Sequence, residues 1–371
     1  MRSFDVLILG AGIVGAACAL ECVQAGARVA IVEPAVPGGG ATAAGMGHLV
    51  VMDDSPAQLA LSHFSRELWR DLMHALPSPV EYEETGTLWV AADDEEMAEV
   101  FARQKTYASS GIASEVLDAD ALAIAEPNLR PGLAGALLVP QDGVIYPPAA
   151  AGYFLSTALQ AGAELLRGQA AVSASHGLVA LEDGTQLAAK RIVITTGADR
   201  RLLPNLPIQK RKGHLVITDR YPGFVRHQLV ELGYLKSAHK VAADSVAFNV
   251  QPRRTGQLLI GSSRQYGSED PAADHAILRQ MLDRAQTYMP AIGRLSALRV
   301  WTGFRAATPD KLPYIGPTED PTVLLAMGFE GLGITNAPGA ARLLADHLFE
   351  RTSALDPTPY LPSRLAVPTY A

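Results

Sequence analysis

The first 33 residues carry the pattern that most constrains the fold of this chain. An apolar run at residues 4–9 (FDVLIL) leads directly into a glycine motif at residues 10–15 (GAGIVG), a helical stretch to Ala25 and a second apolar run at residues 28–32 (RVAIV). Short apolar runs of this kind are typical of buried parallel strands. Strand, G-x-G-x-x-G, helix and strand in this order predict a βαβ unit, and hence an α/β protein with a Rossmann-type domain.

The glycines of the motif have separate roles. Gly10 permits the tight turn, Gly12 lets the backbone approach a pyrophosphate, and Gly15 lets the helix pack closely on the strand. The unpaired N–H groups and the positive end of the helix favour phosphates. Glu33 can accept both hydroxyl groups of an adenosine ribose, and its charge would repel a 2′-phosphate. The predicted dinucleotide site comprises Gly10, Gly12, Ile13, Val14, Gly15 and Glu33. A glycine-rich loop in an unrelated α/β protein is the alternative.

A loop of small residues follows Glu33, where a simple Rossmann enzyme would continue with another βαβ unit. Residues 38–48 (GGGATAAGMGH) let the backbone pass close to a bulky ligand. The glycine motif, Glu33 and this loop resemble the D-amino-acid oxidase (DAO) superfamily of flavoproteins, which includes glycine and sarcosine oxidases and D-amino-acid dehydrogenases. The resemblance implies FAD, rather than NAD, as the cofactor.

The resemblance recurs in the same order along the whole chain. It covers residues 141–147 (QDGVIYP), 191–198 (RIVITTGA), 301–316 (WTGFRAATPDKLPYIG) and 327–338 (MGFEGLGITNAP). It implies further FAD contacts from Ala41, Thr42, Gly45, Met46, Gly47, Val172, Thr196, Gly197, Gly303, Gly331, Leu332, Gly333, Ile334 and Thr335.

The last of these segments leads into a helix that ends near Phe349. Asn336 suits the N-cap position and Pro338 the first helical turn. In the family arrangement the positive end of this helix points at the flavin, where it favours the negative charge of the reduced form. An ordinary capped C-terminal helix is the alternative.

The resemblance implies two domains. An FAD-binding domain is expected from residues 1–80, 140–205 and 300–371, and a substrate domain on a mixed or antiparallel sheet from residues 81–139 and 206–299. The second domain is expected to contain a strand pair at 82–92 and helices at 95–110 and 119–125. Its other strands are expected at 213–219, 229–235, 246–252 and 257–263, and the chain is expected to cross between the domains at 206–212.

Arg305 is the first candidate for the substrate site. Glycine-oxidase-like members of the family place an arginine here that clamps the substrate carboxylate, and a guanidinium offers two parallel donors to that group. An ion pair between the domains is the alternative role. The relatives usually follow this arginine with proline, whereas Ala306 follows it here.

Two more residues are candidates for the substrate site. His48 follows the loop expected near the flavin ring and could contact substrate or flavin, or be a structural histidine. Phe248 lies in the strand where glycine oxidases place an active-site tyrosine. The alignment there leaves Asn249 and Gln251 as equal candidates, and a plain core role for Phe248 also stands.

Two absences refine the expected chemistry. Sarcosine oxidases attach FAD through a cysteine at the position of Gly303, so the FAD here should be non-covalent. They also carry an oxygen-activating lysine at the position that corresponds to Leu259, and its loss favours a dehydrogenase over an oxidase.

Two segments most resemble bacterial D-hydroxyproline dehydrogenases, namely ATAAGMGHLVVMDDSP and EYEETGTLWVAADDEEM. What this implies is oxidation of the C–N bond of cis-4-hydroxy-D-proline or D-proline to a pyrroline carboxylate, with hydride transfer to flavin N5. The electrons would then pass to a partner subunit or another acceptor. An oxygen-using glycine or sarcosine oxidase and an FAD-holding subunit without its own turnover are the alternatives.

Composition excludes several other classes of protein. The net charge of −7 argues against nucleic acid as a partner. The only cysteines, Cys18 and Cys22, suit a reducing cytoplasm, and no metal site is predicted. No apolar run is long enough to span a membrane, although peripheral membrane contact and a homo- or hetero-oligomer remain open.

Overall fold

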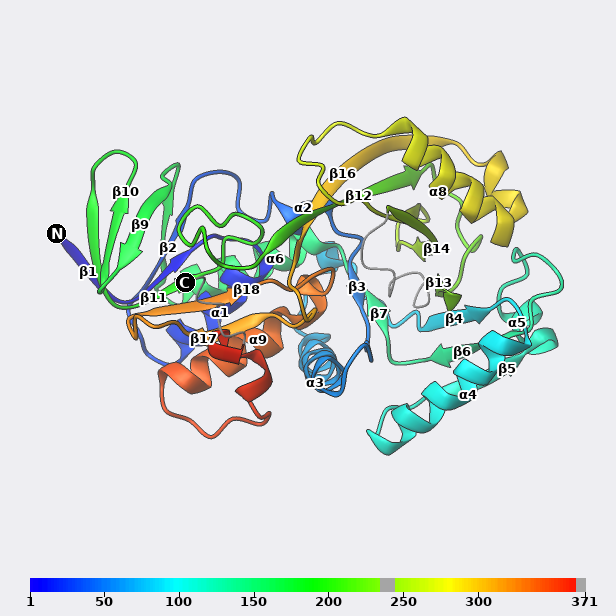
Figure 1. Cartoon of the computed structure of the whole chain (residues 1–371), viewed down its shortest axis with the longest axis horizontal. Helices are drawn as coiled ribbons and strands as arrows, with labels where there is room; N and C mark the ends of the chain where they lie inside the picture. The colour runs from blue at the N-terminus through cyan, green and yellow to red at the C-terminus, as the bar shows by residue number, and fades with distance from the viewer. Residues whose placement is uncertain (234–243, 365–371) are drawn as a thin grey trace, which may run out of the picture.

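Two large sheets lie side by side in the computed structural model, which describes residues 1–233 and 244–364 (Figure 1). The first has eight strands. Its main path runs β17 (Tyr314–Pro317), β18 (Val323–Met327), β11 (Gln186–Ile194), β1 (Arg2–Leu9), β2 (Val29–Glu33) and β8 (Glu164–Arg167), with β10 (Leu178–Leu181) on β11 and β9 (Ala171–Ser175) on β10. The strands from β18 to β8 are parallel to one another, and β17, β10 and β9 join antiparallel.

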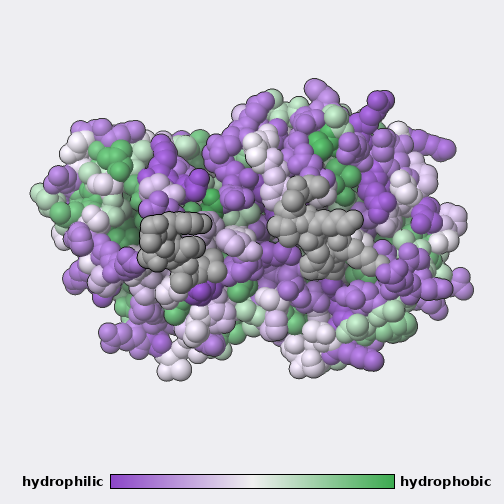
Figure 2. Space-filling view, in the orientation of Figure 1, coloured by the Kyte–Doolittle hydropathy of each residue, from purple (hydrophilic) through white to green (hydrophobic). Residues whose placement is uncertain are grey.

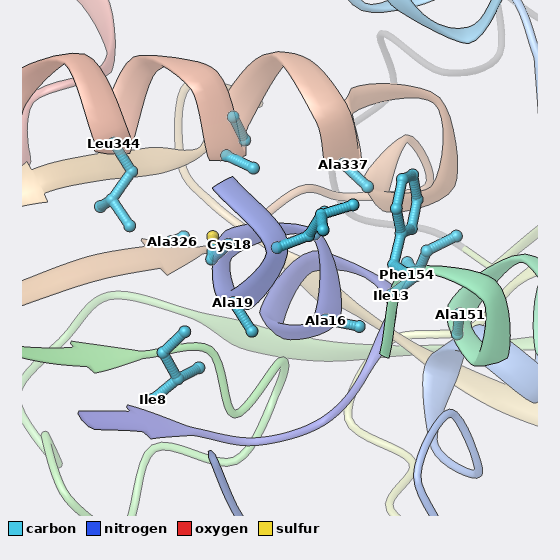
Figure 3. Close-up of a cluster of buried hydrophobic side chains, with 14 of the residues drawn as sticks. Ile8, Ile13, Ala16, Cys18, Ala19, Ala151, Phe154, Ala326, Ala337 and Leu344 are labelled. Atoms are coloured by element: carbon cyan, nitrogen blue, oxygen red, sulfur yellow. The ribbon is translucent and has the colours of Figure 1, made fainter. Parts of the chain in front are cut away.

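Three helices cover one face of this first sheet. They are α1 (Ile13–Gln24), α6 (Pro147–Gln160) and α9 (Gly333–Leu348), and α1 packs against both of the others. Figure 3 shows α1 between the strands and α9, with Ile8, Cys18 and Leu344 in the shared core and Phe154 entering from α6. Small residues line the inner face of α1, which lets the helices approach closely.

The second sheet also has eight strands. Its order is β16 (Ala297–Ala307), β12 (Gln209–Thr218), β15 (Leu258–Arg264), β14 (Ser245–Pro252), β13 (Gln228–Glu231), β4 (Thr87–Ala91), β6 (Gly135–Val139) and β5 (Glu115–Asp118). Neighbours are antiparallel except for β13 and β4. One face packs on α8 (His275–Tyr288), while α4 (Asp94–Ser109) lies on the opposite face. The predicted α/β class, with a Rossmann-type domain and a second sheet, is confirmed.

The remaining elements are shorter or lie outside the two large sheets. They are α2 (Ala41–Ala44), the two-stranded pair of β3 (His48–Leu49) and β7 (Gly143–Val144), α3 (Pro56–Leu72), α5 (Ala119–Ala125) and the 3₁₀ turns η1 (Ser78–Val80), η2 (Pro290–Arg294), η3 (Thr358–Tyr360) and η4 (Pro362–Arg364). No helix in the described part of the chain is long and apolar enough to cross a membrane. The face shown in Figure 2 is mostly polar, with hydrophobic side chains scattered over both halves.

The structure corrects several expected boundaries. Residues 82–92 contain one strand, β4, and not a strand pair, because Glu83 makes only an isolated bridge to Val144. Strand β12 begins at Gln209, inside the segment 206–212 where the chain is expected to cross between the domains. The expected domain border at residue 300 falls inside β16, and the end of the predicted strand 229–235 lies outside the described residues.

The predicted start of the last helix was also wrong. Helix α9 begins at Gly333, so Asn336 is not its N-cap and Pro338 lies inside the helix. A proline there lacks the N–H that would bond the carbonyl of Ile334. The indole Nε1 of Trp69 donates to that carbonyl at 3.1 Å and to the Thr335 carbonyl at 3.0 Å. Helix α3, which carries Trp69, therefore replaces the missing hydrogen bond.

Candidate functional site

A cavity of about 490 Å³ extends from the glycine turn of the first sheet to one face of the second sheet. Most of the residues expected to hold the cofactor line it. They are Gly10, Gly12, Ile13, Val14, Glu33, Ala41, Thr42, Gly45, Met46, Gly47, Thr196, Gly197, Gly303, Gly331, Leu332, Gly333 and Ile334. Segments from three distant stretches of the chain therefore meet in one site.

The glycine turn is shaped by close backbone contacts. Gly10 has a φ of +109°, a conformation that side chains disfavour. A Cβ on Gly15 would lie 2.0 Å from the carbonyl oxygen of Gly10, so the helix can pack here only without a side chain. The Ile13 amide donates to Oγ1 of Thr42 at 3.1 Å, which ties the turn to the small-residue loop. Gly12 supplies no side-chain cap, which leaves α1 with its positive end at the cavity.

Glu33 is held at the end of β2 by two backbone amides. Ala11 N donates to Oε2 at 2.8 Å, and Ala35 N donates to Oε1 at 2.9 Å. These bonds fix the carboxylate in the cavity wall, and each oxygen keeps a lone pair that a ribose hydroxyl can use.

The small-residue loop packs too tightly for larger side chains. A Cβ on Gly45 would lie 2.5 Å from Cδ1 of Ile334, and one on Gly303 would lie 2.4 Å from Cβ of Ala44. Any side chain at 303 would therefore push β16 away from α2. This packing leaves no room at that position for a cysteine that bonds the flavin.

The start of α9 closes the same end of the cavity. Leu332, in the N-cap position, makes no side-chain cap, so the helix amides face the cavity lining formed by residues 331–334. Thr335 does not line the cavity. Its hydroxyl donates to the His48 carbonyl at 2.8 Å and accepts from Val50 N at 3.4 Å, which joins α9 to β3.

Arg305, on β16, also lies beside the start of α9, since a Cβ on Gly331 would lie 3.5 Å from its Nε. Its side chain passes over Gly213, where an added Cβ would lie 2.4 Å from Nη1. The same Nη1 donates to the Ser263 carbonyl on β15 at 2.9 Å. Beside it, Arg211 and Glu330 form a buried ion pair. Burial raises the pKa of Glu330, although the charges of Arg211, Arg264 and Arg305 oppose that rise. The cluster makes this end of the cavity electropositive.

His48 lines the cavity close to this arginine. Burial and the charge of Arg305 lower the pKa of its imidazole to about 3, so the ring is neutral at ordinary pH. Its Nε2 atom is buried and has no hydrogen-bond partner among the described residues. A neutral ring nitrogen of this kind is available to a ligand.

The other predicted residues fall outside the lining. Phe248 is fully buried and stacks on Tyr288 of α8, with ring centroids 4.7 Å apart. Its neighbour Asn249 lines the cavity instead, because successive residues of a strand face opposite sides. Val172 is 59% exposed, next to Ala171 of the lining. Gln251 binds the Met46 carbonyl through Nε2 at 2.9 Å.

Several residues of the lining had no signal in the sequence. Trp89, Arg211, His214, Gln228 and Arg264 all reach the cavity from the second sheet. His214 accepts from the Asp274 amide through Nε2 at 2.9 Å, and its Nδ1 lies 2.9 Å from the Ser263 hydroxyl. Only the strand register brings these residues together.

The fold and the cavity define a class of protein, a dinucleotide-binding oxidoreductase with a separate substrate-facing sheet. Residues 5–347 match the DAO family, described as FAD dependent oxidoreductase, and the chain belongs to this family. FAD is therefore its cofactor, and the geometry of the glycine turn, Glu33 and the α9 start fits that group.

The comparisons also identify similar proteins. Glycine oxidase from Pseudomonas aeruginosa is 27% identical, over 96% of this chain and 98% of that protein. Hydrogen cyanide synthase subunit HcnC from the same organism is 26% identical, over 98% and 96% of the two chains. The crystal structure of glycine oxidase from Geobacillus kaustophilus superposes with a TM-score of 0.88 at 26% identity, covering 98% of this chain and 99% of that one.

Proposed function

We propose that this protein binds FAD without a covalent bond and oxidises the C–N bond of a small amino or imino acid. The observation that carries the proposal is the meeting of an arginine and a neutral imidazole with the dinucleotide turn in one cavity. The similarity to glycine oxidases supports the same class of substrate.

The bound flavin supplies the acceptor for the two electrons of the substrate C–H bond. The residues of the chain bind and orient. Backbone amides at the start of α1 hold the phosphates, and Glu33 holds the adenosine ribose. The uncapped start of α9 provides a positive field at the cavity.

Arg305 binds the substrate carboxylate in this proposal. Its guanidinium offers two parallel donors, and the carbonyl of Ser263 fixes one nitrogen while Gly213 leaves room for the side chain. His48, neutral and without a partner among the described residues, accepts a hydrogen bond from the substrate amine. Holding both groups orients the α-hydrogen without a separate catalytic base.

The finer proposal is a D-configured cyclic imino acid, cis-4-hydroxy-D-proline or D-proline, oxidised to a pyrroline carboxylate. A ring holds its α-hydrogen rigidly, so orienting it costs little entropy. Leu215, Val230 and Met46 give the cavity apolar walls that favour the uncharged amine. The resemblance of residues 41–56 and 81–97 to D-hydroxyproline dehydrogenases supports the same substrate.

We also propose that the protein is a dehydrogenase that passes its electrons to a partner subunit or another acceptor. Leu259, at the position of the oxidases' lysine, is buried and apolar, so no cation there assists oxygen. The buried free thiols of Cys18 and Cys22 fit a reducing, cytoplasmic environment. The similarity to glycine oxidases favours glycine oxidation with oxygen as the second candidate.

Anaerobic mixing tests the proposal. The FAD-loaded protein is combined with D- and L-amino acids, both enantiomers of proline, cis-4-hydroxy-D-proline, glycine and N-methylglycine, and the loss of yellow colour is followed. We expect the fastest bleaching with a D-configured proline derivative and little peroxide on admission of air. Faster bleaching by glycine, with stoichiometric peroxide, would favour the second candidate. If no amino acid bleaches the flavin, both candidates are wrong and the remaining alternative is an FAD-holding subunit without its own turnover.

A further inference from the structure

Four uncharged side chains that line the cavity present buried polar atoms without a hydrogen-bond partner in the described part of the chain. The atoms are His48 Nε2, Trp89 Nε1, Gln228 Oε1 and Asn249 Oδ1. Buried polar groups are nearly always satisfied in native proteins. Atoms of this kind that line a cavity therefore mark positions where polar groups of a ligand can bind.

Three of these side chains share one face of the second sheet. Val230 of β13 pairs with Trp89 of β4 on one side and with Asn249 of β14 on the other. Gln228 lies two residues before Val230, so its side chain faces the same way. Directly paired residues have Cβ atoms about 5 Å apart. Trp89, Gln228 and Asn249 thus lie around Val230 on this face, with Trp89 and Asn249 two strand spacings apart, and we call these three residues the polar row.

The polar row is rigid before any ligand binds. Trp89 and Gln228 are 2% and 1% exposed, and the Arg103 guanidinium lies 5.1 Å from the ring centroid of Trp89. Gln251, two residues beyond Asn249, bonds the Met46 carbonyl and so ties this strand to the segment that carries His48. Side chains fixed in this way lose little entropy when a ligand arrives.

The position of the polar row relative to Arg305 sets the size of the ligand. Arg305 Nη1 bonds the Ser263 carbonyl on β15, and Gly261 of that strand pairs with Asn249. Ser263 lies on the strand next to Asn249 and two residues further along it. These two offsets together place the Ser263 and Asn249 positions about 8 Å apart. A small amino acid whose carboxylate meets Arg305 can therefore reach the polar row with a substituent of its side chain or ring.

The chemistry of the polar row favours a hydroxyl group as that substituent. The indole N–H donates only, whereas the amide oxygens of Gln228 and Asn249 accept. A hydroxyl can accept from the indole and donate its single hydrogen to one of the two amide oxygens, so one group can satisfy both types of partner. The substrate amine suits the polar row less well, because its lone pair must be free to form the C=N bond. A substituent with no polar atom would leave the polar row unsatisfied.

We propose that Trp89, Gln228 and Asn249 recognise a hydroxyl group on the substrate, which makes a hydroxylated imino or amino acid the preferred substrate class. This inference rests on the proposed function, since it assumes that the carboxylate is bound by Arg305. A site built to bind a hydroxyl discriminates strongly against the analogue that lacks it, because its buried polar groups are then left unpaired.

The test compares one substrate pair in the FAD-loaded protein. Anaerobic flavin bleaching gives the second-order rate constant of flavin reduction by cis-4-hydroxy-D-proline and by D-proline, which differ only in the hydroxyl. We expect the wild type to prefer the hydroxylated compound by at least about 100-fold. In Asn249→Leu and Gln228→Met, which keep similar volume without the amide, we expect most of that preference to disappear, mainly through slower reaction of the hydroxylated compound.

The controls separate recognition from folding. Asn205→Leu makes the same change at an exposed position outside the cavity lining and should keep the wild-type ratio. FAD content, and the flavin absorbance change on adding pyrrole-2-carboxylate, a planar ligand without hydroxyl, should be unchanged in all variants.

Equal rates for the two substrates in the wild type, or an unchanged ratio in both Asn249→Leu and Gln228→Met, would overturn the inference and leave the proposed function standing. Failure of the wild type to oxidise either proline, with rapid oxidation of glycine, would overturn the proposed substrate and the inference together.

Discussion

Replacement of Arg305 is the sharpest test of the substrate site. Arg305→Ala removes the only guanidinium that passes over Gly213 and bonds the Ser263 carbonyl among the described residues. We expect the variant to keep its FAD, because Arg305 makes none of the hydrogen bonds that hold Glu33 or tie the glycine turn to the small-residue loop. We expect it to bind substrate carboxylates poorly, because their charge is left without its partner in a partly buried site.

The magnitude follows from the partial burial of this arginine. Truncating one partner of a buried, hydrogen-bonded charge pair costs roughly 2–5 kcal/mol, and the lower half of that range applies to a half-buried side chain. At about 1.4 kcal/mol per factor of ten, a loss of about 2–3 kcal/mol raises KM by roughly 30- to 150-fold. Arg305→Lys keeps the charge but lacks the planar guanidinium, so its KM should lie between those of the wild type and Arg305→Ala.

The assay is the concentration dependence of anaerobic flavin reduction, with FAD content measured from the absorbance spectrum. Arg299→Ala is the matched control, since Arg299 is an exposed arginine of the same strand that stacks on Trp301 and lies outside the cavity lining. An unchanged KM in Arg305→Ala, or an equal rise in Arg299→Ala, would refute the carboxylate-binding role.

Three further predictions address the frame of the site. Gly15→Ala should lower the free energy of unfolding by about 1–3 kcal/mol and reduce FAD content, because its Cβ would lie 2.0 Å from a backbone oxygen. Gly152→Ala is the control, since a Cβ added there would meet no atom within 4 Å, and it should leave the thermal unfolding temperature and the FAD content unchanged or slightly higher. Trp69→Phe should cost about 1–3 kcal/mol in urea unfolding, since it leaves the Ile334 carbonyl without its indole donor, and full stability in this variant would contradict that role. The folded-state pKa of His48 is about 3, below its ordinary value of 6.5, so the unfolded chain takes up this proton first and stability falls as pH drops from 6.5 towards 3. In His48→Gln, the fall in stability with decreasing pH should be smaller by up to about 1.4 kcal/mol per pH unit. Parallel curves of stability against pH for the two proteins would refute the lowered pKa of His48.

The last helix shows where local sequence signals mislead. Asn336 and Pro338 together predict a helix start, because each residue is common in the first turn. The helix begins three residues earlier, and Trp69 from a distant helix satisfies the carbonyl that the proline leaves open. A tertiary contact therefore outweighed a local preference, and nothing in residues 327–338 alone could reveal it.

Phe248 shows the same limit in a strand. The resemblance pointed to β14, a strand that borders the cavity, but a shift of one residue exchanges the two faces of a sheet. Phe248 packs on Tyr288 in the core, and Asn249 faces the cavity.

The sequence by itself determined the dinucleotide turn and the position of Glu33, because each depends on residues whose role is local. A glycine is required where the backbone passes close to itself, and an acidic residue at the end of β2 is positioned by the strand that carries it. The polar row was decided only by the tertiary structure. Its members come from β4, β13 and β14, and the parallel pairing of β13 with β4 sets them side by side. Register between distant strands depends on the packing of both faces of the sheet, which no local pattern encodes.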